Sequence, residues 1–170
     1  MNPRLTILML ALSLAGSLLP PAQTYAQVPA AIAVSGETIV ATFHAEGAQV
    51  YECKFDPAYK LVWQFREPIA ALMLDGKTVG LHSAGPNWQH LDGSAVRAKM
   101  VSSAPGATSN DVAWLKLETT EQRGNGTLSH VTTVQRINTK GGATQGPCET
   151  AGAYHSAPYS ADYVFLRKAN

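Results

Sequence analysis

The densest cluster of side chains suited to chemistry lies between residues 82 and 94, around the dipeptide Gly85-Pro86. It consists of His82, Asn87, Trp88, His90, Asp92 and Ser94. Imidazole and carboxylate groups are ligands that zinc and copper accept in proteins, and a loop can fold three of them together. His82, His90 and Asp92 are therefore candidate metal ligands. Their spacing matches no specific metal motif, and the alternative is a structural turn in which Trp88 packs.

Trp88 is also a candidate for binding a flat ligand. It stands between Asn87 and Gln89 in a polar stretch, and one interpretation, besides the turn in which Trp88 packs, is a loop that presents the indole ring to solvent. An exposed indole can stack on a sugar ring or another flat molecule. By contrast, Trp63 and Trp114 belong to apolar strands, and we expect both in the core.

A second candidate ligand site surrounds Arg136 and Asn138, beside Gly141-Gly142. A guanidinium group is well suited to holding an anion. The alternative is that Arg136 simply pairs with an acidic neighbour.

Two catalytic motifs are incomplete. A serine hydrolase elbow reads Gly-x-Ser-x-Gly, but one residue too many separates Gly80 from Ser83. Gly124-Asn-Gly126 begins like a dinucleotide fingerprint, but Ser129 occupies the third glycine position and the flanking segments look like strands.

We therefore favour a non-catalytic binding or structural domain, with a small-molecule or glycan ligand and no predicted cofactor. The alternative function is a small metal-dependent enzyme or hydrolase that uses His82, His90 and Asp92 with zinc or copper.

The first 26 residues have the pattern of a signal peptide. Arg4 precedes an apolar run from Leu5 to Leu19, and Pro20-Pro21 follows. The run is shorter than the roughly 20 residues that a membrane-spanning helix needs. We expect cleavage before Gln27, no membrane span in the mature chain, and a single secreted or periplasmic domain over residues 27–170.

Charge and cysteine content fit export. The sequence has 13 Lys+Arg and 12 Asp+Glu, and the predicted signal peptide holds one basic residue, Arg4, so the mature chain has 12 of each sign. The basic residues are scattered, which does not favour nucleic acid binding. Cys53 and Cys148 are the only cysteines, and an isolated pair in an oxidising compartment predicts a disulfide. The alternatives are two buried free thiols, or a metal or nucleophile role for one of them.

Alternation with a period of two residues dominates from Ile32 onward, and no window repeats apolar residues at helical spacing over three turns. Strands are predicted over 38–44, 48–55, 61–65, 77–82, 95–101 and 160–167, with breaks at Glu46-Gly47, Glu67-Pro68 and Asp75-Gly76. About eight to nine strands with hairpin-length breaks predict an all-β domain. It is either a single antiparallel β-barrel or a two-sheet β-sandwich.

The clearest turn signal lies between residues 112–118 and 127–138, two segments rich in β-branched and aromatic residues. Asn125-Gly126 stands between them and suits the two positive-φ positions of a type I′ turn. The sequence therefore predicts a tight β-hairpin at this point.

Four strings in this order carry a family resemblance. They are Gly47-Ala-Gln-Val-Tyr-Glu-Cys53, His82-Ser-Ala-Gly-Pro-Asn-Trp88 with Asp92-Gly-Ser94, Val134-Gln-Arg-Ile-Asn-Thr139 with Gly141-Gly142, and Tyr159-Ser-Ala-Asp-Tyr163. Across nearly the whole mature chain, the sequence resembles the secreted bacterial and fungal family named domain of unknown function 3455. The resemblance implies a secreted single domain without an established activity. Some members carry malate dehydrogenase names, which nothing in this sequence supports. The family often has an acidic residue where this chain has Gln89.

Overall fold

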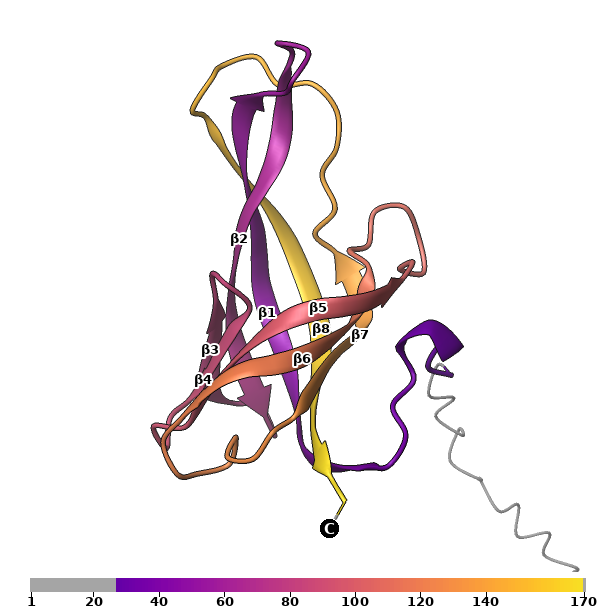
Figure 1. Cartoon of the computed structure of the whole chain (residues 1–170). Coiled ribbons are helices and arrows are strands. Elements are labelled where there is room, and N and C mark those ends of the chain that lie inside the picture. The colour runs from indigo at the N-terminus through magenta and orange to yellow at the C-terminus, as the bar shows by residue number, and fades with distance from the viewer. Residues whose placement is uncertain (1–26, 170) are drawn as a thin grey trace, which may run out of the picture.

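The computed structural model describes residues 27–169, and the predicted signal peptide lies outside the described residues. Eight strands form one antiparallel sheet: β1 (Glu37–Phe55), β2 (Leu61–Leu74), β3 (Lys77–Ser83), β4 (Asn87–His90), β5 (Ala95–Ala104), β6 (Trp114–Arg123), β7 (Thr133–Gly141) and β8 (Tyr154–Lys168). Each strand pairs with its neighbours in sequence, and β8 also pairs with β1 (Figure 1). The all-β prediction is confirmed, and the sheet closes into a barrel rather than splitting into a sandwich.

The main core fills the barrel and is built from the inward-facing residues of its strands. Its members include Phe43, Leu72, Trp88, Leu117, Tyr163 and Phe165. On β8, Ala161, Tyr163 and Phe165 face inward, and each is at most 1% exposed. A smaller second cluster joins Ile32 of the short 3-10 helix η1 (Ala30–Ile32) to Ala104 and Trp114. No helix within residues 27–169 is long and apolar enough to cross a membrane.

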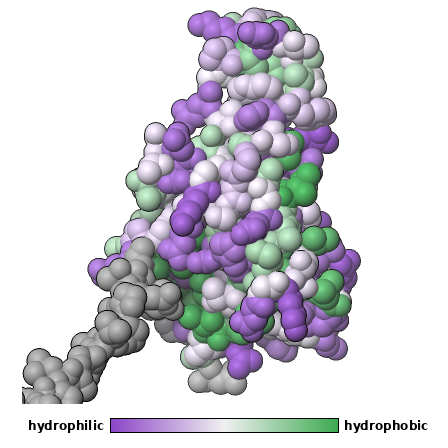
Figure 2. Space-filling model, turned by 180° about the vertical axis from the view of Figure 1, so that it is seen from behind, coloured by the Kyte–Doolittle hydropathy of each residue, from purple (hydrophilic) through white to green (hydrophobic). Residues whose placement is uncertain are grey.

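Three long strands, β1, β2 and β8, continue past the barrel as an arm, defined here as residues 51–66 and 142–157 (Figure 1). In Figure 2 the arm is the narrow part that rises above the wider barrel. The predicted disulfide between Cys53 and Cys148 lies in the arm, with the two Cα atoms 5.9 Å apart. It is confirmed, and together with the hydrogen bond from Gly152 N to Cys53 O it fastens the segment before β8 onto β1.

One predicted turn is confirmed and another is wrong. Asp75 and Gly76 have φ values of 50° and 73°, and they join β2 to β3 as a two-residue turn of the kind that favours glycine. In contrast, neither Asn125 nor Gly126 has a positive φ. The predicted pair of strands does form, as β6 and β7, but residues 124–132 connect them as a longer loop.

Two predicted strand breaks are also wrong. Gly47 lies inside β1, where a Cβ atom would collide with the backbone of Ile69 and Ala70 on β2. Glycine is therefore required there for a close approach of two strands, not for a turn. Pro68 lies inside β2, next to a bulge in the pairing with β1. It is tolerated because β3 joins β2 only from Ala70 onward, so β2 is an edge strand at the proline.

The tryptophan predictions fail in two of three cases. Trp88 belongs to strand β4, not to a loop, and is only 1% exposed, so the prediction of a solvent-facing indole is wrong. Trp63 lies on the arm and is half-buried, with its ring 5.4 Å from that of His155, so its assignment to the core is wrong. Trp114 is buried as predicted, although in the second cluster.

Candidate functional site

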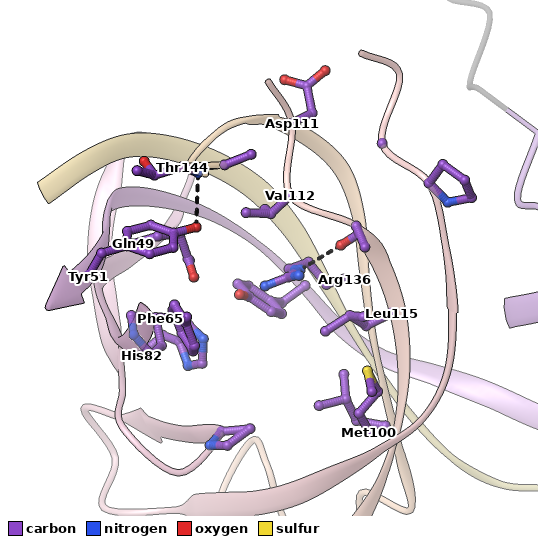
Figure 3. Close-up of a pocket in the computed structure, with 18 of the residues that line it drawn as sticks. Gln49, Tyr51, Phe65, His82, Met100, Asp111, Val112, Leu115, Arg136 and Thr144 are labelled. Atoms are coloured by element: carbon purple, nitrogen blue, oxygen red, sulfur yellow. Dashed lines mark hydrogen bonds between the residues drawn. The ribbon is translucent and has the colours of Figure 1, made fainter. Parts of the chain in front are cut away.

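A cavity of about 850 Å³ lies at the end of the barrel from which the arm extends (Figure 3). It exists because the wall is incomplete here: β3 pairs with β2 only from Ala70 onward, and β4 spans only four residues. Every strand contributes to the lining. One lining residue from each strand, from β1 to β8 in order, is Gln49, Phe65, His82, Trp88, Met100, Leu115, Arg136 and Tyr163. Loop residues 105–113 and 143–145 complete the rim.

The floor of the cavity is a packed group of three rings. The β3–β4 register places His82 opposite Trp88, and their rings stack at 4.6 Å with only 2° between the planes. Tyr163 packs its ring against both at steep angles, 4.9 Å from His82 and 5.3 Å from Trp88. All three side chains are at most 4% exposed, so the floor is rigid and shaped before any ligand arrives.

His82 is held in its neutral form. Burial is the main cause that lowers its pKa to about 4; the positive charge of Arg136 acts in the same direction, and the hydrogen bond with Asn87 opposes them. The Nδ1 atom lies 3.0 Å from the carbonyl oxygen of Asn87. Because a carbonyl can only accept, Nδ1 carries the proton and Nε2 remains an acceptor.

Arg136 brings a positive charge to the cavity wall. On β7 it lies opposite Leu115 of β6 and Tyr163 of β8, and its Nε atom donates to the carbonyl oxygen of Ala113 at 3.0 Å. It forms no ion pair with any residue between 27 and 169. The interpretation that Arg136 pairs with an acidic neighbour is therefore wrong.

The groups around Arg136 carry no charge at neutral pH. Burial raises the pKa of Tyr159 and of Tyr163, and Arg136 opposes that rise in both. Burial also raises the pKa of Tyr51, whose hydroxyl donates to the carbonyl oxygen of Gly142 at 2.7 Å. Together with neutral His82, these groups surround the guanidinium without compensating its charge.

Two lining residues carry a buried polar atom that has no hydrogen-bond partner. These atoms are Gln49 Nε2 and Trp88 Nε1, and each side chain is only 1% exposed. Trp114 Nε1 and Thr119 Oγ1, outside the lining, are unpaired in the same way. Our sequence analysis did not single out Gln49. Strand alternation could have revealed it, because Gln49 shares a face with Tyr51 and Cys53.

Of the predicted site residues, the structure brings His82, Trp88 and Arg136 together in the cavity lining. The others lie outside it. Asn87 donates to Ser83 Oγ at 3.4 Å, and Asn138 donates to Asp162 Oδ2 at 2.8 Å.

Asp92, Ser94 and His90 form a structural network at the β4–β5 turn. Asp92 accepts the backbone N–H groups of Ser94 and Thr127 at 2.9 and 2.7 Å, and Ser94 Oγ accepts the N–H of Leu128 at 3.1 Å. The hydroxyl of Ser94 is the largest of the causes that hold the pKa of Asp92 below its usual range. This network ties the loop after β6 to the turn, which explains why that loop is not a tight hairpin.

The three candidate metal ligands are divided between these two places. His82 belongs to the cavity floor, whereas His90 Nδ1 lies 2.9 Å from Asp92 Oδ2 at the turn. Within residues 27–169, no group of three or more His, Cys, Asp or Glu side chains is arranged to hold a metal ion.

Comparison with curated proteins and with solved structures found no significant match. One protein family does match, over residues 34–77 and 73–167, which together include all eight strands except the last residue of β8. The match covers far more than half of the chain and agrees with the resemblance seen in the sequence. The chain therefore belongs to the family described as protein of unknown function (DUF3455).

Proposed function

We propose that this protein is a binding domain whose cavity holds a small, largely apolar molecule without transforming it. The observation that carries this proposal is the lining itself. Apolar side chains such as Phe65, Met100 and Leu115 share the cavity with Arg136, a cation that has no ion-pair partner among residues 27–169. A cavity of about 850 Å³ with this mixture is typical of small-molecule sites.

A purely structural role would leave one charged group unexplained. Partly buried charges in proteins are usually paired. Arg136 is a half-buried cation in the lining and forms no ion pair with any residue between 27 and 169. A ligand that pairs with it would supply the missing negative charge, which favours binding over a passive scaffold.

Catalysis has less support in the geometry. Nucleophilic catalysis needs a hydroxyl or thiol hydrogen-bonded to a base. Among the hydrogen bonds of residues 27–169, histidine rings meet Asp162, Asp92 and the carbonyl of Asn87, and none meets a serine, threonine or cysteine side chain. The disulfide is typical of an oxidising compartment, so we propose that binding takes place outside the cytoplasm.

The test is titration with N-phenyl-1-naphthylamine, an uncharged apolar dye that fluoresces in apolar surroundings. We expect saturable binding with one dye per chain. Leu115→Trp should weaken it by narrowing the cavity, whereas Leu81→Trp should not, because Leu81 is 56% exposed and lies outside the lining.

Denaturant unfolding must show that both variants are folded. A wild-type protein that does not bind the dye saturably would overturn the proposal. Equal binding by wild type and a folded Leu115→Trp variant would overturn it too.

A further inference from the structure

We infer that the natural ligand is an apolar monocarboxylate whose carboxylate pairs with Arg136. This inference rests on the proposed binding function and adds the chemical class of the ligand. It begins from the position of Arg136, a cation in a mostly apolar cavity that the protein itself does not neutralise.

Withdrawing a guanidinium from water is costly, so partly buried charges in proteins are usually paired. Arg136 has only the Ala113 carbonyl oxygen on its Nε atom and the Tyr163 hydroxyl beside it. Neither partner carries a negative charge. Folding has already withdrawn part of the Arg136 guanidinium from water. An anion that enters the cavity can therefore pair with Arg136 without paying that desolvation cost again.

The other charged groups of the lining are already engaged. Arg66 pairs with Glu67, with 3.2 Å between Nε and Oε1. Asp111 accepts the N–H of Gly141 at 2.6 Å and the hydroxyl of Thr108 at 2.8 Å. In Figure 3 its carboxylate lies at the rim and points away from the cavity. Asp111 therefore does not compete with a ligand for Arg136.

The charge of the site selects a carboxylate over a phosphate. A phosphate carries up to two negative charges and is normally bound by several cations or by a cluster of backbone N–H groups. Here a single unpaired guanidinium faces the cavity (Figure 3), and His82 on the cavity floor is neutral. The planar fork of arginine matches the two oxygens of one carboxylate.

The remaining lining completes the recognition. Phe65, Met100 and Leu115 provide an apolar wall. In Figure 3, Phe65 lies on the His82 side of the cavity, whereas Met100 and Leu115 lie on the Arg136 side. An alkyl or aromatic body between these walls would leave its carboxylate next to the guanidinium.

The experiment compares decanoate, decan-1-ol and decyl phosphate as competitors of bound N-phenyl-1-naphthylamine. We expect wild type to prefer decanoate over decan-1-ol by about tenfold or more, the size of a charge-assisted hydrogen bond. Arg136→Met, which keeps the length but removes the charge, should abolish that preference. Arg97→Met is the matched control, because Arg97 is exposed, pairs with Glu121 and lies outside the lining.

Equal competition by the acid and the alcohol in wild type would overturn the inference, as would stronger competition by decyl phosphate. So would dye binding that none of the three compounds displaces. These outcomes differ from failure of the proposed function, in which the dye itself does not bind.

A second measurement avoids variants altogether. Decanoate labelled with ¹³C at its carboxyl carbon, titrated by NMR while bound to wild type, should show a pKa below that of free decanoate. A raised pKa would contradict an ion pair with Arg136.

Discussion

Protonation of His82 should destabilise the folded protein as the pH falls. Burial is the main cause that lowers its pKa from 6.5 to about 4. Between these two values the unfolded chain binds the proton and the folded chain does not, so stability rises with pH across this window. The contribution is fully present above pH 6.5 and decreases as the pH falls toward 4. Between pH 7 and pH 5 the expected loss is roughly 2 kcal/mol.

The assay is denaturant unfolding at both pH values for wild type and His82→Phe. Phenylalanine keeps an aromatic ring against Trp88 but cannot titrate. Other groups contribute equally to both proteins, so the difference between their losses isolates His82. His155→Phe serves as the matched control, because His155 is exposed. Identical pH dependence of wild type and His82→Phe would refute the reasoning that burial keeps His82 neutral.

Four further predictions concern stability and metal binding. Trp88→Ala should cost roughly 3–5 kcal/mol by cavity formation and more than Trp63→Ala, as measured by denaturant midpoints; equal costs would contradict the assigned burial. Thiol titration of the denatured, unreduced protein should find no free thiol, and reduction should lower the free energy of unfolding by up to roughly 4–5 kcal/mol. Zinc or copper should not raise the melting temperature; stoichiometric metal lost on His82→Ala would revive the metalloenzyme alternative. Arg136→Met should unfold at no lower denaturant concentration than wild type, because the unpaired charge is removed.

The parts of the fold that depend on local chemistry could be predicted from the sequence. Alternation predicted a strand over residues 160–167, within β8, and Asp75-Gly76 was recognised because its residues suit positive φ. Gly47 and Pro68 were misread as breaks, since the role of each is decided by a partner strand. Asn125-Gly126 failed for the same reason: the Asp92 carboxylate, distant in sequence, holds the loop that contains it.

Three residues of the site, His82, Trp88 and Arg136, were predicted from the sequence, but their grouping and the rest of the lining were not. Arg136 was recognised as a possible anion ligand because a guanidinium suits that chemistry wherever it lies. The burial of Trp88 was missed because β4 spans only four residues with polar neighbours, a composition that looks like a loop. Pairing with β3 on one side and β5 on the other is what turns its ring inward.

The unpaired charge of the cavity is better explained by selection for binding than by imperfect packing. Buried polar atoms without a partner do not distinguish the two, because Trp114 Nε1 and Thr119 Oγ1 are unpaired outside the cavity lining as well. Arg136 does distinguish them, because its guanidinium lines the cavity beside a rigid aromatic floor and has no ion-pair partner between residues 27 and 169. The rest of the barrel is closed by continuous strand pairing, so the fold can support this local cost. A ligand that pairs with Arg136 regains free energy that folding alone leaves unused, and the same ligand would stabilise the folded state in proportion to its affinity.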